Sequence, residues 1–188
     1  MELEIRLAEP ADASHVAKLH ADSWRRHYRG AYSDRYLDGD LDGDRLAVWT
    51  ERIKGDDRGA FTLLAERRDR PVGFVHVVLD ADRTWGALVD NLHVAHSVQR
   101  SGIGTLLLDR AARTIIERRP GSGVFLWVLE RNQPAQAFYL SRGGTLCGRE
   151  LASPPGGDPR NLDGAPRKIR VAWSDPRALI RREGDHHA

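Results

Sequence analysis

Several residue types that mark particular classes of protein are scarce or balanced in this chain of 188 residues. A single cysteine, Cys147, excludes an internal disulfide framework. The 29 basic and 27 acidic residues nearly cancel, and no basic stripe of the kind that marks nucleic-acid-binding proteins is present. No apolar run approaches the roughly 20 residues of a membrane-spanning helix, and the acidic, alternating residues 1–6 are unlike a signal peptide. We therefore expect a cytoplasmic protein that binds neither nucleic acid nor membrane.

The spacing of the apolar residues predicts one mixed α+β domain over residues 3–174, followed by a polar tail over 175–188. Alternating or continuous apolar segments predict strands over 3–7, 61–66, 72–78, 88–94, 124–129, 146–147 and 168–173. The segment between 88–94 and 124–129 has helical spacing. These two strands therefore form a βαβ unit and should run parallel.

The segment Gln99–Thr105 lies between the strand at 88–94 and the helix that follows it. The first amides of a helix have no internal partners, and the helix dipole favours negative charge there. Gly102 and Gly104 remove the side chains that would keep a phosphate away from those amides. The order of strand, glycine-bearing loop and helix therefore predicts a ligand that carries phosphate.

Three phosphate-binding loops can be distinguished by their spacing. A P-loop has four residues between two glycines and then a lysine, neither of which is present. A dinucleotide fingerprint needs a third glycine where the bulky Leu107 stands. The third is a Gln/Arg-x-x-Gly-x-Gly/Ala loop that grips the pyrophosphate of coenzyme A, and Gln99-x-x-Gly102-x-Gly104 fits it at every defined position. On these residues the sequence resembles the GNAT superfamily of acyl-CoA-dependent N-acyltransferases.

A second motif carries the same resemblance. The segment Asn132–Gly143 matches the Asn-x-x-Ala-x-x-Phe-Tyr-x-x-x-Gly pattern of that superfamily and follows a strand, as the family arrangement requires. The resemblance covers roughly residues 3–174. It implies a GNAT-like fold: a central mixed, mostly antiparallel sheet with one parallel, splayed strand pair, flanked by about four helices. It also implies acetyl-CoA as acyl donor, with no need for a metal.

The resemblance assigns coenzyme A to three segments of the chain. The backbone groups of Leu92 and Val94 would pair with pantetheine, and the amides of residues 100–105 would take the pyrophosphate. Asn132 has two compatible roles, capping a short helix and binding the pantetheine arm or a water. The full set of expected cofactor-binding residues is Leu92, His93, Val94, Gln99, Arg100, Ser101, Gly102, Ile103, Gly104, Thr105, Asn132, Ala135 and Tyr139.

Transfer to an amine also needs proton transfer, because a lysine-type primary amine has a pKa near ~10 and is protonated at neutral pH. The resemblance implies Tyr139 as the general acid for the departing thiolate. Asp90, on the strand that borders the site, is the candidate base. His76 and His93 are rivals, although His76 has the pattern of a core residue and His93 is expected to pack against the cofactor. A chain of water molecules without a single base remains an alternative.

The acceptor side is expected to come from the first two helices and the loop that joins them. Trp24 and Tyr28 are four residues apart and lie on one helical face, so they could form the wall of an acceptor pocket or belong to the core. With His76 and Asp90 they form the expected substrate-binding set. One departure from the family pattern is Gly144, where relatives usually have phenylalanine, which removes packing behind the helix of Tyr139.

Together these features predict an N-acetyltransferase that transfers acetyl from acetyl-CoA to a primary amine of a small molecule by direct attack in a ternary complex. A protein or peptide amine is the alternative acceptor. A non-catalytic acyl-CoA-binding sensor is the alternative from another class. Dimers are common among relatives, which leaves a homodimer open by analogy.

Overall fold

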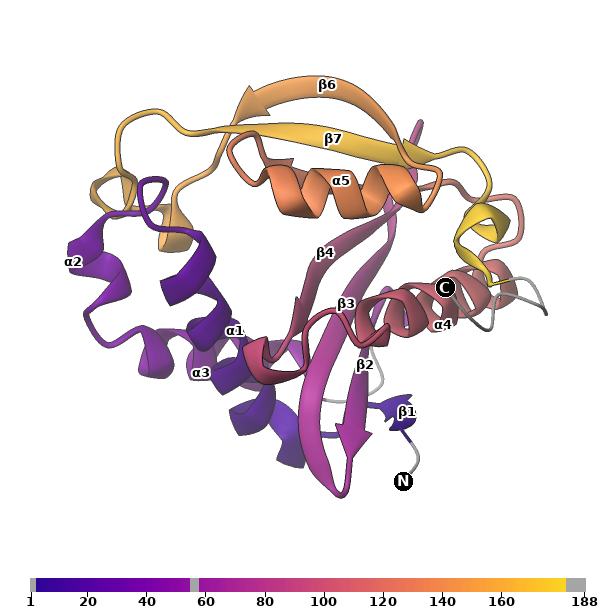
Figure 1. Ribbon diagram of the computed structural model, residues 1–188, viewed down its shortest axis with the longest axis horizontal. Helices are drawn as coiled ribbons and strands as arrows, with labels where there is room; N and C mark the ends of the chain where they lie inside the picture. The colour runs from indigo at the N-terminus through magenta and orange to yellow at the C-terminus, as the bar shows by residue number, and fades with distance from the viewer. Residues whose placement is uncertain (1–2, 55–57, 182–188) are drawn as a thin grey trace.

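The structure is a computed structural model that describes residues 3–54 and 58–181, and its centre is one seven-stranded sheet (Figure 1). The strands lie in the order β1-β2-β3-β4-β5-β7-β6. Their bounds are Leu3–Leu7 for β1, Ala60–Arg67 for β2, Arg70–Asp82 for β3, Gly86–Val94 for β4, Val124–Leu129 for β5, Thr145–Leu151 for β6 and Arg167–Trp173 for β7. Neighbouring strands are antiparallel except β4 and β5, which are parallel. The predicted fold class is confirmed.

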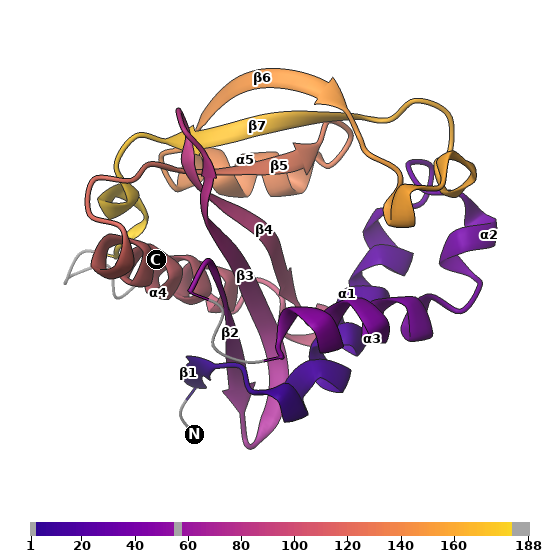
Figure 2. The same cartoon turned by 180° about the vertical axis from the view of Figure 1, so that it is seen from behind.

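The described part of the chain contains five α-helices. They are α1 (Ala13–His27), α2 (Asp34–Leu37), α3 (Leu41–Arg52), α4 (Ile103–Arg118) and α5 (Gln133–Ser141). Helices α1 and α3 cover one face, whereas α4 and α5 lie on the other (Figures 1 and 2). The amphipathic pattern explains α4, because Ile103, Leu107 and Ile115 are all buried against the sheet.

The parallel pair is short, and this shapes the centre of the molecule. Only three residues of β4 pair with β5, from Ala87 with Val124 to Val89 with Leu126. Beyond these pairs the strands continue to Val94 and Leu129 without pairing to each other. The two strands therefore separate at their C-terminal ends, as the family resemblance implies.

The C-terminal segment differs from the sequence prediction of a polar tail from residue 175. Residues Pro176–Leu179 form a 3₁₀ turn (η5) that packs on α4, and Leu179 is only 3% exposed. The carboxylate of Asp109 in α4 accepts a hydrogen bond from the backbone N–H of Arg181 at 2.7 Å. Isolated apolar residues in a polar segment give no periodic signal, so this packing on α4 could not be predicted from the sequence. Residues 182–188 lie outside the described part.

Residues 3–54 and 58–181 contain neither a membrane-spanning helix nor a cluster of metal-binding side chains. No helix there combines the length and the apolar character needed to cross a membrane. In the same ranges, no three histidine, cysteine, aspartate or glutamate side chains are grouped so that they could hold a metal ion.

Candidate active site

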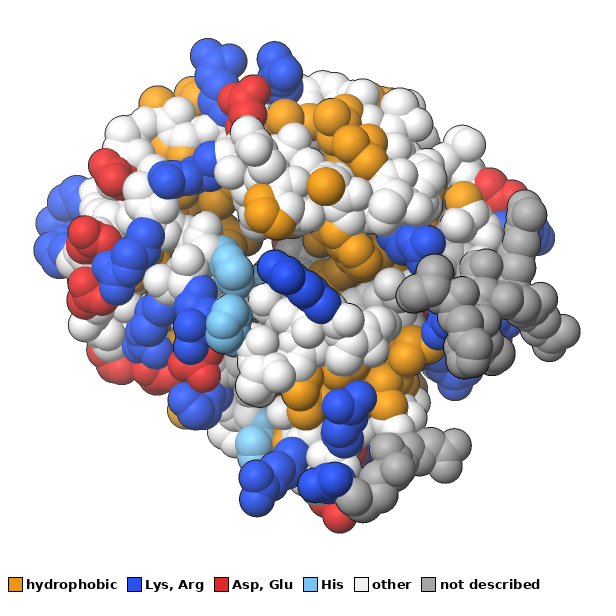
Figure 3. Space-filling model, in the orientation of Figure 1, with side chains coloured by type: hydrophobic (Ala, Val, Ile, Leu, Met, Phe, Trp, Pro, Cys, Tyr) orange, Lys and Arg blue, Asp and Glu red, His pale blue; other side chains and the backbone are white. Residues whose placement is uncertain are grey.

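A cavity of about 640 Å³ lies where β4 and β5 separate. On the face shown in Figure 3 the surface is hollowed between the layer of α5 and the start of α4, with histidine side chains at the edge of the hollow. Most of the residues predicted from the sequence line this cavity: Tyr28, Asp90, Leu92, His93, Val94, Gln99, Arg100, Gly102, Ile103, Gly104, Thr105, Asn132, Ala135 and Tyr139. The tertiary structure thus brings together residues from four separate segments of the chain.

The start of α4 presents a row of unpartnered backbone donors to the cavity. Gln99 N–H donates to His96, and the next donor to a backbone carbonyl is Leu106, which bonds to Gly102. No backbone partner is recorded for the six amides of residues 100–105 within the described part of the chain. Gly102 caps the helix with φ +83°, a left-handed conformation that glycine adopts without strain. Free amides at the start of a helix are suited to binding an anion.

The free edge of β4 adds backbone groups to the cavity. Ala95 N–H donates to Val72 in β3, which directs the polar groups of Ala95 and of His93, two residues earlier, toward β3. By alternation, the backbone groups of Leu92 and Val94 face the gap between β4 and β5. The side-chain amide of Gln99 donates to the Val94 carbonyl at 3.3 Å. This edge has the geometry that an extended amide-bearing chain needs in order to pair as an added strand.

The opposite wall of the cavity is the N-terminal turn of α5. The side chain of Asn132 accepts a hydrogen bond from Ala135 N–H at 3.2 Å, so its predicted capping role is confirmed. Asn132 and Ala135 both line the cavity, which also brings Asn132 close enough for its second predicted role.

Tyr139 of α5 also lines the cavity, and its phenol has no hydrogen-bond partner among the described residues. Burial raises the pKa of Tyr139, and the nearby phenol of Tyr28 adds to the effect, so the hydroxyl is protonated at neutral pH. Trp173 of β7 packs edge-on against the Tyr139 ring, with 6.3 Å between ring centroids.

Trp173 also explains the departure at Gly144. A Cβ on Gly144 would lie 2.5 Å from Cγ1 of Val171 and 2.7 Å from Cζ2 of Trp173, so these two side chains of β7 already occupy the space beside this glycine. The indole N–H of Trp173 donates to the Arg142 carbonyl at 2.9 Å and fixes the end of α5. The packing expected to be missing behind the Tyr139 helix is thus supplied from another strand.

Asp90 lies at an irregularity of β4. The register with β3 shifts between His76–Asn91 and Val77–Val89, which leaves Asp90 as the extra residue of a bulge. Its Oδ2 atom accepts hydrogen bonds from Nη1 of Arg52 and from Nδ2 of Asn91, each at 2.7 Å. Among the described residues that line the cavity, Asp90 is the only acid.

The histidines and the tryptophan that the sequence suggested have different surroundings. His93 borders the cavity, but its Nδ1 is 2.8 Å from Ser23 Oγ, and burial lowers its pKa to about 3. His76 is buried against Trp49, with Nδ1 2.8 Å from Thr62 Oγ1, and does not line the cavity. Trp24 is likewise absent from the lining and belongs to a buried aromatic cluster. His76 and Trp24 are therefore core residues, which was one of the two interpretations of their spacing.

Sequence reasoning missed several residues that line the cavity. They include Ser23, His27, Asn91, Trp127, Leu129 and Phe138, which lie next to the predicted residues. Ser23 and His27 are four residues apart on α1, and this spacing in the sequence places them on one face of the helix. Ser101 was predicted to bind the cofactor but does not line the cavity. Its hydroxyl donates to the Val98 carbonyl at 2.6 Å.

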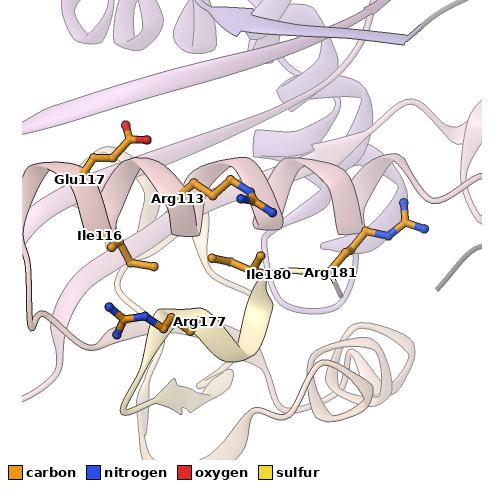
Figure 4. A pocket seen from close by; sticks show the side chains of 6 residues that line it. All are labelled: Arg113, Ile116, Glu117, Arg177, Ile180 and Arg181. Atoms are coloured by element: carbon orange, nitrogen blue, oxygen red, sulfur yellow. The ribbon is translucent and has the colours of Figure 1, made fainter. Parts of the chain in front are cut away.

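A second cavity of about 440 Å³ lies between α4 and the η5 turn (Figure 4). Its lining side chains are those of Arg113, Ile116, Glu117, Arg177, Ile180 and Arg181. Arg113 also bonds through Nε to Asp109, the residue that holds the C-terminal segment on α4. The cavity therefore lies at a structural contact, and none of the residues of the two sequence motifs lines it.

Comparison with known proteins agrees with this geometry. The model of the acetyltransferase (GNAT) family matches residues 18–143. The chain belongs to the GNAT acetyltransferase family. This GNAT chain is 30% identical to a protein of Mycobacterium tuberculosis named "probable N-acetyltransferase" over 154 residues, which are 81% of this chain and 86% of the relative. It is 26% identical to an uncharacterized N-acetyltransferase of Bacillus subtilis over 137 residues, 72% of this chain and 76% of the relative.

The fold is also found among solved structures. The PaiA N-acetyltransferase of Thermoplasma acidophilum, solved in complex with coenzyme A, superposes with a TM-score of 0.67 at 19% identity. The superposition covers 92% of this chain and all of that one (100%). Membership of the GNAT family makes this protein one of a family of acyltransferases and is consistent with acyl transfer from coenzyme A.

Proposed function

We propose that this GNAT protein transfers an acetyl group from acetyl-CoA to the primary amine of a small molecule, by direct attack in a ternary complex. The observation that carries the proposal is the continuity of the cavity. One cavity is lined by the start of α4 with its unpartnered amides, by Tyr139 and Asp90, and by the aromatic ring of Tyr28. A donor and an acceptor can therefore occupy it at the same time, which alignment of two reactants requires.

The donor side is supported by how well its polar groups match coenzyme A. The amides of residues 100–105 and the positive end of the α4 dipole suit the pyrophosphate, and Arg100 adds a cation. The free edge of β4 at Leu92 and Val94 suits the two amides of the pantetheine arm. One of these backbone N–H groups would also polarise the acetyl carbonyl.

In this proposal Tyr139 donates a proton and Asp90 accepts one. Bound acetyl-CoA would supply a thioester, whose C–S bond breaks as the amine nitrogen bonds to the carbonyl carbon. Tyr139 keeps its proton because burial raises its pKa, and it gives that proton to the departing sulfur. Asp90 holds the incoming ammonium group and accepts one proton from it, directly or through water. The second proton that the nitrogen loses as the amide forms passes through water to the Tyr139 phenolate.

The lining of the acceptor side supports a small molecule over a peptide. The aromatic residues Tyr28, Trp127 and Tyr139 line the cavity, and Asp90 is the only acid among the described lining residues. A pocket with aromatic walls and one carboxylate is suited to a compact cation. An open groove with several acids would favour a basic peptide instead.

Calorimetry with acetyl-CoA, followed by measurement of thiol release against a panel of small primary amines and lysine-containing peptides, tests this function. We expect binding of acetyl-CoA and turnover with one or more small amines. Turnover with peptides alone would change the acceptor class. Binding of acetyl-CoA without turnover on any amine would support an acyl-CoA sensor.

A further inference from the structure

His27 is the last residue of α1, and it lines the same cavity as the unpartnered amides at the start of α4. Ser23, one turn earlier on α1, also lines the cavity, so both side chains lie on the helix face that borders it. No hydrogen bond of the His27 imidazole is recorded among the described residues. The negative end of the α1 dipole lies at this residue and favours a positive charge on it.

The turn before α4 brings a second histidine close to His27. His96 begins the 3₁₀ turn η2 (His96–Val98), and its carbonyl accepts a hydrogen bond from Gln99 N–H at 3.3 Å. His27 and His96 are close enough for the charge of one to act on the other. In Figure 3, histidine side chains and a basic side chain meet at the edge of the hollow. The end of α1 therefore lies beside the segment that leads into the loop of free amides.

Apart from Asp90, the charged or titratable groups around His27 are positive or neutral. They are Arg26 and Tyr28 on α1, His93 on β4, His96 in η2, Arg100 in the loop before α4, and Tyr139 on α5. Asp90, the only acid among the described lining residues, is ion-paired with Arg52. Burial lowers the pKa of His27, and His96 and Arg26 lower it further. In the protein alone, His27 is therefore neutral at pH 7.

The fixed charges that line the cavity supply only part of what a diphosphate needs. Its phosphates carry one negative charge each, whereas Arg100 is the only lining residue with a permanent positive charge in the described part of the chain. His93 does not supply the second charge, because burial holds its pKa at about 3 and its Nδ1 lies 2.8 Å from Ser23 Oγ. An anion raises the pKa of a basic group that it contacts. His27 is therefore the lining residue that can become a cation when a diphosphate binds.

We propose that His27 is a coenzyme-binding residue: its imidazole takes up a proton from solvent when the diphosphate binds, and the imidazolium donates a hydrogen bond to a phosphate oxygen. This role rests on the proposed function and adds to it a cofactor contact from α1, which neither sequence motif contains. Bound coenzyme then links the end of α1 to the loop before α4. Because the contact needs a proton, the affinity for coenzyme falls as the pH rises above neutrality.

Calorimetry in buffers of low and high heat of ionisation counts the protons that the protein takes up with a ligand. The measurement is made at pH 6.5 with two probes, acetyl-CoA and acetyl-dephospho-CoA. The 3′-phosphate of coenzyme A has a second pKa near ~6 and titrates in the same range as histidine. Acetyl-dephospho-CoA lacks this group and keeps the diphosphate, so any proton taken up with it binds to the protein.

We expect the native protein to take up about half a proton or more with each probe. His27→Gln keeps a polar side chain that does not titrate, and its uptake should fall below about 0.2 proton. This variant should also bind acetyl-dephospho-CoA about threefold or more weakly at pH 6.5, with a smaller difference at pH 8.5. His15→Gln changes an exposed histidine of α1 outside the cavity and is the matched control, with native uptake and affinity.

The outcomes separate this role of His27 from the proposed function. Equal proton uptake by His27→Gln and the native protein would assign the proton to another group and overturn the role. Uptake with acetyl-CoA alone would place the proton on the 3′-phosphate and overturn it as well. In both cases acetyl-CoA still binds and the proposed function stands. Failure of both probes to bind the native protein would instead contradict the proposed function, and the role of His27 with it.

Discussion

Asp90 of β4 and Arg52 at the end of α3 form an ion pair at the edge of the cavity, with 2.7 Å between Oδ2 and Nη1. Arg52 also lies over the ring of Trp49, 5.2 Å from its centroid, which limits the positions that the guanidinium can take. Because both side chains are about a third exposed, the pair is screened by solvent and orients the carboxylate more than it stabilises the fold.

The first prediction concerns this pair. Asp90→Asn should lower kcat/KM for the amine by about 10² or more, because it removes the proton acceptor and the charge that holds the ammonium group. Arg52→Met should lower it by less than about tenfold, since only the orientation of Asp90 is lost, and Arg52→Lys should lower it less. The double variant Asp90→Asn with Arg52→Met should be no worse than Asp90→Asn alone. Additive losses in steady-state kinetics would show that Arg52 acts independently of Asp90.

The second prediction concerns the general acid. Tyr139→Phe should lower kcat by about 10² while changing the affinity for acetyl-CoA by less than about threefold, because only the proton donor is removed. Tyr32→Phe, in the buried cluster next to the cavity, is the control for loss of a phenol. A Tyr139→Phe variant with native kcat in the thiol-release assay would reject this role.

The third prediction concerns the glycine loop. A Cβ on Gly104 would make ordinary contacts, 3.6 Å from Phe138 and 3.8 Å from Val94, so Gly104→Ala should cause only a small loss of acetyl-CoA affinity. The larger Gly104→Val would extend over the unpartnered amides and should weaken binding by at least about tenfold, or 1.4 kcal/mol. Calorimetry measures both values. Equal affinities for the two variants would place the diphosphate elsewhere.

The fourth prediction is a loss of stability in mild acid. Burial lowers the pKa of His93 to about 3, whereas an unfolded histidine titrates near ~6.5. Below about pH 6.5 the unfolded chain therefore binds a proton that the native state does not, and this site lowers the free energy of unfolding by about 2 kcal/mol between pH 7 and pH 5. Buried His20, whose pKa is also lowered, acts in the same direction.

Urea unfolding at the two pH values measures this effect. His93→Phe should reduce the difference between pH 7 and pH 5 by about 2 kcal/mol, whatever its effect on stability at pH 7. Substitution of the exposed His15 by glutamine is the control. An unchanged difference in His93→Phe would mean that His93 is accessible to protons in the native state.

The fold and the donor side of the site could be predicted because their signals are local. Gly102 and Asn132 are the N-cap residues of α4 and α5. The strands at 88–94 and 124–129 were predicted from runs of apolar residues. Spacing alone could not decide between pocket and core for Trp24 and Tyr28, which share a helical face. The structure buries the first in an aromatic cluster and places the second in the cavity wall.

By itself, the sequence determined which segments form strands and helices and where a helix begins with free amides, because turn residues and apolar spacing act over a few neighbours. Only the tertiary structure decided that Arg52 holds Asp90, that Trp173 fills the space beside Gly144, and that residues 31–33 meet 161–163. Each of these contacts joins segments far apart in the chain. Their partners are selected by the packing of the whole sheet and leave no local pattern to read.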